Sequence, residues 1–149
     1  KEDKVIIDSG IDASPLVREI YRLCLKKGAY VKVNIGLPGM AKIYYDNASD
    51  EQLNYFPEMS MFEAKYGDVF ISIGSTRNTR ALTSVDPKKI AKRSKITNSI
   101  SEEILKKRWV LFEYPGNAQA QEADMSLEEF EDFVYNATIQ DWEKISQDD

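Results

Sequence analysis

The sequence predicts an α/β fold: a Rossmann-like, three-layer domain with a four-stranded, mainly parallel sheet. Two observations support this prediction. Short apolar runs alternate along the chain with longer segments of helical periodicity, which is typical of a parallel sheet with helices on its faces. Most of these runs are apolar at consecutive positions, which indicates strands buried on both faces. We expect the strand order 2-1-3-4, with the first and third strands at the centre.

The central stretch of the chain is the apolar run Asp68–Gly74. It is too short for a free helix and rich in β-branched and aromatic side chains, so we predict a strand buried on both faces. The loop that follows, Ser75–Arg80, combines small hydroxylated residues with two arginines. Ligands of open parallel sheets sit beyond the carboxyl ends of the strands. We therefore expect a substrate or anion site at this loop, with Arg77, Asn78 and Arg80 as its candidate residues.

A strand, a helix and a second strand are predicted in the first third of the chain. The strand contains Val5–Ile7, and the helix begins after Ser14, which suits an N-cap and is followed by proline. Apolar residues then recur at helical spacing until Gly28, and alternation over Tyr30–Ile35 predicts the second strand. Cys24 falls on the inward stripe of the helix, so we interpret it as a core residue and not as a reactive thiol.

Two short helices, Met40–Asn47 and Ser49–Phe56, are predicted after a break that contains two glycines and a proline. The break lacks a third glycine and follows the second strand, so it does not match a dinucleotide-binding fingerprint. Met59, Met61 and Phe62 precede the central strand. Such residues suit either an adaptable binding surface or gap-filling in a core, and the second use is the more common one.

A further helix is predicted to begin at Asp86 and Pro87, with Ile90 and Ala91 turned inward. Five basic residues gather on this helix. They are Lys88, Lys89, Lys92, Arg93 and Lys95. We interpret this basic cluster as a solvated helix face, with binding to an acidic partner as the alternative.

The last third of the chain shows two further helix starts of the capping-box type, at Ser99 and at Ser126. A separate helix is therefore expected from Ser99. It is followed by a fourth strand over Trp109–Phe112, and the helix that begins at Ser126 comes after that strand. Trp142 and Ile145 are expected to close the chain on a short amphipathic tail.

The composition excludes several classes of protein and site. The chain has 149 residues, 42% of them hydrophobic and 30% charged, which suits one ordinary globular domain. Its net charge of −5 argues against a nucleic-acid or membrane-surface partner. With no histidine and one cysteine, a Cys/His zinc site, a Ser-His-Asp triad, a histidine base and an internal disulfide are all unavailable. We expect a reducing, cytoplasmic setting. Because the chain opens at Lys1, we also expect a piece of something longer.

Several segments of the chain carry a resemblance to a known family. They are Val5–Ile7 with Ser14–Arg18, Ala48–Leu53, Asn78–Leu82 with Val85–Pro87 and Ile90–Ala91, and Tyr114–Pro115 with Ala120–Tyr135. In this order, and without large gaps, they resemble the amino-terminal domain of the aminopeptidase T family of metal-dependent aminopeptidases, especially its archaeal leucyl-aminopeptidase-like members. The resemblance covers most of the chain and is most specific from Tyr114 to Tyr135. Where the family often has a glycine before Met-Ser, this chain has Asp124.

The resemblance implies that the whole protein releases amino-terminal residues from peptides with two divalent metal ions, zinc or cobalt. In the family, the metal ligands lie in a carboxy-terminal domain that is not part of this sequence. Residues 1–149 are therefore expected to be a single amino-terminal domain with no catalytic and no metal-ligating residue. Family members are dimers around an inner cavity. The resemblance thus implies a homodimer in which this domain, joined to its own catalytic domain, walls the cavity and screens peptide substrates.

Two questions stay open at this point. Arg77, Asn78 and Arg80 either face the cavity, where they hold a substrate carboxylate or a neighbouring chain, or brace their loop and pair with surface glutamates. The chain itself is either this non-catalytic domain or a free-standing Rossmann-like module that binds a small ligand or a protein. We expect the isolated chain to bind no zinc or cobalt tightly and to hydrolyse no leucyl-amide substrate. Ile71→Ala should cost roughly 2–5 kcal/mol of stability if that side chain is fully buried.

Overall fold

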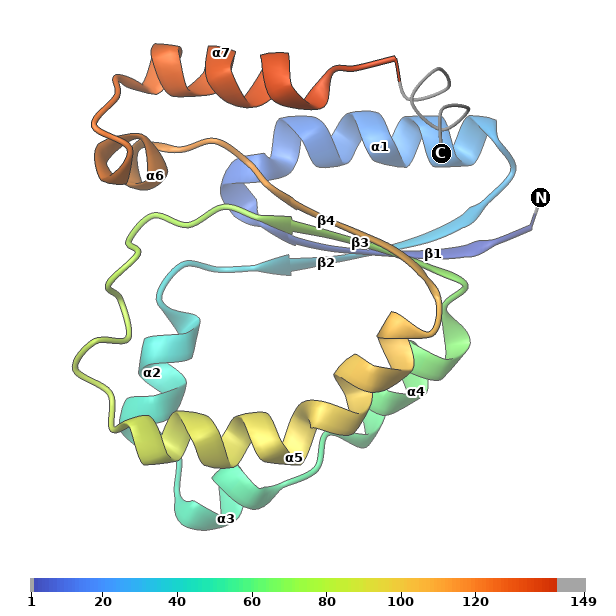
Figure 1. The fold of residues 1–149 in the computed structure, drawn as a ribbon. Helices are drawn as coiled ribbons and strands as arrows, with labels where there is room; N and C mark the ends of the chain where they lie inside the picture. The colour runs from blue at the N-terminus through green and yellow to red at the C-terminus, as the bar shows by residue number, and fades with distance from the viewer. Residues whose placement is uncertain (1, 142–149) are drawn as a thin grey trace. The chain divides into compact units, whose positions relative to one another are not determined.

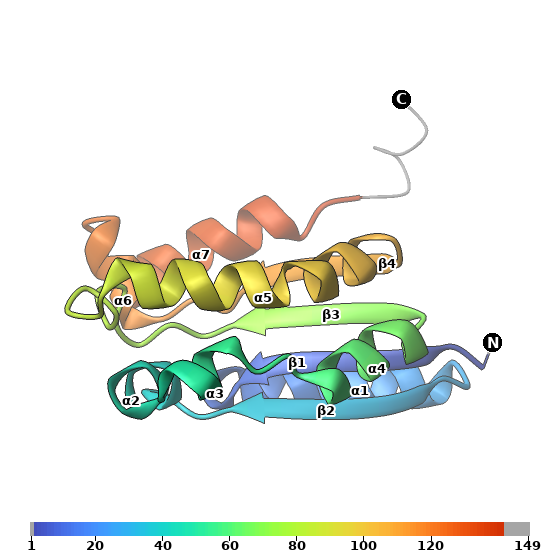
Figure 2. The same cartoon turned by 90° about the horizontal axis from the view of Figure 1, so that it is seen from below.

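Four parallel strands form one sheet in the computed structural model, which describes residues 2–141 (Figure 1). The strand order is β2-β1-β3-β4, and each neighbouring pair is parallel (Figure 2). The strands are β1 (Lys4–Gly10), β2 (Tyr30–Gly36), β3 (Val69–Gly74) and β4 (Arg108–Glu113). The predicted fold class and strand order are confirmed, and the sheet is entirely parallel.

The described residues divide into two compact units. Unit 1 comprises residues 2–75 and 80–114, and unit 2 comprises residues 76–79 and 115–141. Unit 1 holds the sheet with helices α1 (Ser14–Lys26), α2 (Met40–Asn47), α3 (Asp50–Asn54), α4 (Glu58–Tyr66) and α5 (Pro87–Leu105). Unit 2 holds helices α6 (Asn117–Glu122) and α7 (Leu127–Thr138). The expectation of a single amino-terminal domain of a longer enzyme stays a prediction.

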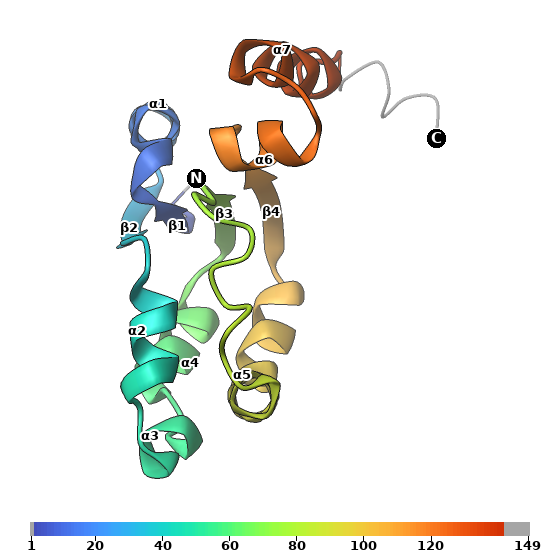
Figure 3. The same ribbon diagram turned by 90° about the vertical axis from the view of Figure 1, so that its left-hand side faces the viewer.

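The sheet of unit 1 has helices on both faces. Helix α1 covers one face, here called the α1 face, and helices α2 to α5 lie on the other side, here called the α5 face, with α3 farthest from the sheet (Figures 1 and 3). Successive side chains of a strand point to opposite faces. Ile7 therefore belongs to the α1 face, and its register neighbours are Val33 and Ile71. Asp8 belongs to the α5 face.

The α1 face carries the main hydrophobic core of unit 1. Its buried members are Val5, Ile7, Ala13, Val17 and Ile73. Cys24 is partly buried and packs against this core, and burial raises the pKa of its thiol above the ordinary value. The interpretation of Cys24 as a core residue is confirmed. Ser14 is not the N-cap: a short 3-10 turn precedes α1, so that Ser14 is already its first residue.

Helix α4 was not predicted, because its apolar residues do not recur at a clear helical spacing. Met59 and Phe62 lie on it and are 78% and 62% exposed, so the core interpretation is wrong for both. Helices α2 and α3 agree with prediction, and Ser49 caps α3 with both hydrogen bonds of a capping box. No helix among residues 2–141 is long and apolar enough to cross a bilayer.

Helix α5 is continuous, so the prediction of a separate helix from Ser99 is wrong. No glycine or proline interrupts residues 88–105, and the Asn98 side-chain amide donates to Glu102 Oε1 at 2.7 Å within the helix. A capping-box sequence therefore does not start a helix where the preceding residues already continue one. Asp86 is the N-cap, as predicted, and accepts from the Lys88 N–H at 2.9 Å. Ala91, expected to face inward, is exposed.

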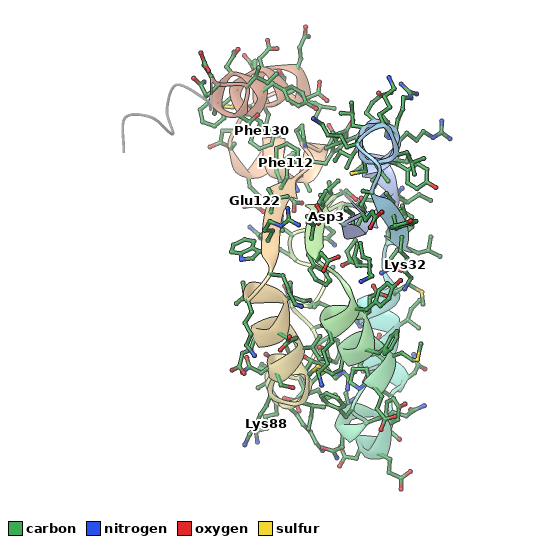
Figure 4. All side chains as sticks on the ribbon, turned by 90° about the vertical axis from the view of Figure 1, so that its right-hand side faces the viewer. Asp3, Lys32, Lys88, Phe112, Glu122 and Phe130 are labelled. Carbon is green, nitrogen blue, oxygen red and sulfur yellow. The ribbon has the colours of Figure 1, made fainter. Side chains whose placement is uncertain are left out.

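The basic cluster on α5 is not only a solvated face. Lys89 Nζ donates to the Tyr45 carbonyl at 2.8 Å, and Lys92 pairs with Asp50 at 3.3 Å. Arg93 donates to the Tyr55 carbonyl. These three residues therefore bind α5 to helices α2 and α3. Lys88 and Lys95 are exposed, and Lys88 points away from the sheet at the start of α5 (Figure 4).

Burial on both faces is confirmed for β3 and wrong for β4. Phe70 and Ile73 lie on opposite faces of β3, and each is 2% exposed. On β4, Trp109, Val110 and Leu111 are 52%, 51% and 68% exposed. β4 is the edge strand, and helix α1 packs mainly against β1 and β2 on the other half of the sheet.

Unit 2 begins helix α7 with the predicted capping box. The Ser126 side chain accepts from the Glu129 N–H, and the Glu129 carboxylate accepts from the Ser126 N–H. The second bond lowers the pKa of Glu129. Thr79 donates to Glu122 of α6 at 2.8 Å. Trp142 and Ile145, expected on a terminal tail, lie outside the described residues.

Candidate functional site

Two hollows meet on the α5 face of unit 1, and Asp8 and Asn34 line both of them. The first, here called the α4 cavity, has a volume of about 530 Å³ and lies between the sheet and helices α4 and α5. The second, here called the carboxyl-end groove, has a volume of about 590 Å³. It runs along the carboxyl ends of β1, β2 and β3, where open parallel sheets bind ligands.

A polar cluster of Asp8, Lys32, Asn34 and Glu63 lines the α4 cavity. The parallel register of β1 and β2 places Asp8 opposite Asn34, and Lys32 precedes Asn34 on the same face. Lys32 projects from the outer strand β2 (Figure 4). Helix α4 supplies Glu63. The strands and this helix together thus bring four polar side chains to one place.

Asn34 connects the two carboxylates of the polar cluster. Its side-chain nitrogen donates to Asp8 Oδ1 at 2.9 Å and to Glu63 Oε1 at 2.5 Å. Lys32 Nζ pairs with the other Glu63 oxygen. The Glu63 side chain is 21% exposed and that of Lys32 is 56% exposed. The ion pair is therefore partly screened by solvent, and the Glu63 side chain is more protected than that of Lys32.

The rest of the α4 cavity is mostly apolar and aromatic. Ile6 and Phe70 of the sheet are each 2% exposed and line it together with Ile100 of α5. Phe62 and Tyr66 of α4 stack with ring centroids 5.8 Å apart and an interplanar angle of 16°. A mostly apolar pocket with a few convergent polar groups is the usual form of a small-molecule site.

The predicted site residues lie in the loop after β3 and are exposed. Arg77 and Asn78 belong to unit 2, Arg80 belongs to unit 1, and none of the three is without a partner. The loop leads to the N-terminus of α5, where the Asp86 carboxylate already accepts from Lys88 N–H. One backbone N–H at that helix end is therefore already bonded, so fewer free N–H groups are available to an external anion than the sequence indicated. The cavity role of the three residues stays a prediction.

The polar cluster was not predicted from the sequence, although one signal was present. Asp8 and Asn34 each stand two residues before the glycine that ends their strand, Gly10 and Gly36. These glycines are register partners, so the two polar side chains lie side by side. Glu63 could not be found in this way, because its helix was not predicted.

The metal ions that the resemblance implies do not fit the side chains that the structure brings together. Among residues 2–141, no group of three or more histidine, cysteine, aspartate or glutamate residues could hold a metal ion. The polar cluster offers two carboxylates, one of them paired with the Lys32 ammonium. Zinc and cobalt sites generally include imidazole or thiolate ligands.

The sequence matches the model of one protein family, described as thermophilic metalloprotease (M29), over residues 1–148. No curated protein matches it. Among solved structures, wild-type AmpT from Thermus thermophilus is similar with a TM-score of 0.70 and 20% sequence identity, over 97% of this chain and 41% of that chain. The structural likeness shows the fold. The family match spans nearly the whole sequence and confirms the resemblance, so the chain belongs to the M29 family of thermophilic metalloproteases.

Proposed function

We propose that this chain is the non-catalytic amino-terminal domain of a metal-dependent aminopeptidase, which releases amino-terminal residues from peptides. The M29 family match over residues 1–148 carries the proposal. The chain spans 41% of the length of AmpT, which leaves room in such a protein for a further domain. Two zinc or cobalt ions would be bound by that further domain, where they would activate the water that attacks the peptide bond.

The proposed role of the domain is to wall the inner cavity of a cytoplasmic homodimer and to control the access of peptides. Its partners are then its own carboxy-terminal catalytic domain, the second subunit and the peptide substrate. Arg77, Asn78 and Arg80 are the proposed contacts with substrate carboxylates or a neighbouring chain, since guanidinium groups suit bidentate pairing with a carboxylate. Their exposed position in the loop after β3 is compatible with this role.

The experiment compares the 149-residue chain with the longer protein from which we propose it derives. Hydrolysis of leucyl-p-nitroanilide is measured with added zinc or cobalt, and zinc binding is measured by calorimetry. We expect turnover and stoichiometric zinc binding in the longer protein, and neither in the 149-residue chain. Hydrolysis by the short chain, or stoichiometric sub-micromolar zinc binding to it, would contradict the proposal. Light scattering on the longer protein tests the expected dimer.

The alternative function is that of a free-standing module that binds a small ligand or a protein. The α4 cavity favours it, because its size and its mixture of polar and aromatic residues suit a small molecule. The length of the source protein separates the two proposals. A protein more than twice this length, with a second half rich in glutamate and histidine, supports the peptidase.

A further inference from the structure

The α4 cavity has a polar end and an aromatic wall. Its volume of about 530 Å³ lies within the range of roughly 300–1,000 Å³ common for small-molecule sites. The polar end consists of the polar cluster already defined. The aromatic wall consists of Phe62, Tyr66 and Phe70. The two parts together determine which ligand the cavity can hold.

The polar end offers hydrogen-bond acceptors. The side-chain amide nitrogen of Asn34 has two N–H donors, and both point to carboxylates, at Asp8 and at Glu63. What Asn34 can offer a ligand is its carbonyl oxygen, Oδ1. Each carboxylate accepts about four hydrogen bonds, so Asp8 retains acceptor capacity beside its bond from Asn34. A ligand that fits this end therefore carries several N–H donors.

The charge of the polar end selects a monovalent cation. Within the polar cluster, Asp8 and Glu63 contribute two negative charges and Lys32 one positive charge, so the cluster itself has a net charge of −1. A calcium or magnesium ion favours a shell of about six or more oxygen ligands, which this cluster, with two carboxylates and one amide oxygen, does not supply. A primary ammonium group has a single charge and three N–H donors.

The aromatic wall suits the same ligand. Ring faces attract cations and also pack against apolar groups. Tyr66 already shows this property, because Lys4 Nζ lies 4.9 Å from the centre of its ring. Phe70 is buried in the cavity wall. Phe62 and Tyr66, in contrast, are 62% and 50% exposed. An apolar group packed against this wall would cover aromatic surface that now faces water.

We propose that the α4 cavity binds a primary ammonium group attached to an apolar group. The ammonium donates hydrogen bonds to the acceptors of the polar cluster, and the apolar group lies against the aromatic wall. A free amine, an apolar amino acid and the amino terminus of a peptide all share this chemistry. The inference goes beyond the proposed function and does not rest on it, because all the groups belong to this chain and none is metal-bound.

The test is a titration of the isotope-labelled 149-residue chain, followed by two-dimensional NMR of the backbone amides. The probes are isoamylamine, its neutral isostere isoamyl alcohol, L-leucine, leucinamide and the peptide Leu-Gly-Gly. We expect saturable, roughly millimolar binding of the amine, as is typical of so small a ligand. The shifted signals should belong to β1, β2 and α4, and the alcohol should cause no such shift. Tighter binding of leucine than of leucinamide identifies a free amino acid as the ligand; the reverse identifies a peptide amino terminus.

Asp8→Asn and Glu63→Gln keep the shapes of the side chains and remove one negative charge each. Loss of a charged hydrogen-bond partner should weaken amine binding about tenfold. Asp46→Asn is the matched control, since Asp46 pairs with Lys42 on α2 and does not line the cavity. Circular dichroism identifies variants that do not fold. If Asp8→Asn does not fold, the result for Glu63→Gln decides.

The proposal is overturned if the folded chain binds no amine, binds the alcohol as tightly as the amine, or binds calcium or magnesium more tightly than the amine. Unchanged amine binding in the folded variants overturns it too.

Discussion

Burial at single positions of β3 determines how much each side chain contributes to stability. Ile71 and Ile73 lie on the same face, but Ile73 is 2% exposed and Ile71 is only half-buried. The condition attached to the expected cost of Ile71→Ala is therefore not met. We expect Ile73→Ala to lower the free energy of unfolding by about 2–5 kcal/mol, and Ile71→Ala to lower it by clearly less. Urea unfolding of the two variants measures both values. Equal losses of stability would contradict the difference in burial between Ile71 and Ile73.

Asp124 is a second position where local geometry gives a prediction. Its φ is +54°, in the left-handed region that favours glycine. It follows α6, at the place where members of the family that the chain resembles often have a glycine. Aspartate tolerates this region better than β-branched residues do. We expect Asp124→Gly to leave stability unchanged or raise it by up to about 1 kcal/mol, and Asp124→Val to lower it by about 1–2 kcal/mol. Thermal unfolding checks the order of the two variants; a more stable valine variant would contradict it.

The sequence predicted the burial of Phe70 and Ile73 because a short, continuous apolar run is typical of a strand covered on both faces. It did not predict the partial exposure of Ile71. Alternation places Ile71 and Ile73 on one face, yet burial there depends on how far α1 and its preceding turn extend over the sheet. That extent is a property of packing and not of the strand sequence.

At the scale of elements, the basic cluster of α5 now has a structural role for three of its members. Arg93 makes the most informative contact, because it donates to the Tyr55 carbonyl and also lies over the Tyr44 ring, 5.8 Å from its centre. Both contacts join α5 to the α2–α3 segment. Arg93 is half-buried, and its hydrogen bond to the Tyr55 carbonyl is exposed.

We expect Arg93→Met to lower the free energy of unfolding by about 1–3 kcal/mol, because it removes a charged hydrogen bond and a cation–π contact but keeps an apolar stem. Lys95→Met on the same helix is the control. Lys95 is exposed, and substitutions at such surface positions usually change stability by less than about 0.5 kcal/mol. Denaturant unfolding of both variants is the measurement. Similar small losses would mean that the cluster is a solvated face after all.

The helices that were predicted have N-caps or an apolar periodicity that can be recognised in the local sequence. Asp86 and Ser126 are examples, since each side chain accepts from a backbone N–H of its own first turn. Helix α4 has no side-chain cap and exposes Met59 and Phe62, so neither signal was present. Its position depends instead on packing against α5, which lies far along the chain.

At the scale of the whole molecule, the topology explains why the polar cluster lies where it does. The order β2-β1-β3-β4 brings Asp8 and Asn34 together, although 26 residues separate them. Ligands of open parallel sheets bind beyond the carboxyl ends of the strands, and on this basis the sequence predicted a site in the loop after β3. The structure shows a lined hollow at that end as well, over β1, β2 and β3. The region could be predicted, whereas the residues required the register of the strands and the unpredicted helix α4.

The loop after β3 gives the last prediction, which concerns the longer enzyme proposed above. If Arg77 and Arg80 hold a substrate carboxylate, replacing both by alanine should lower kcat/KM for peptides about tenfold or more, since charged hydrogen bonds to substrate are lost. Metal content and melting temperature should not change. Arg18→Ala with Arg22→Ala is the matched control, because both arginines are exposed on α1. Unchanged kinetics would exclude the cavity role. A lower melting temperature with normal kinetics would show instead that the two arginines brace their loop.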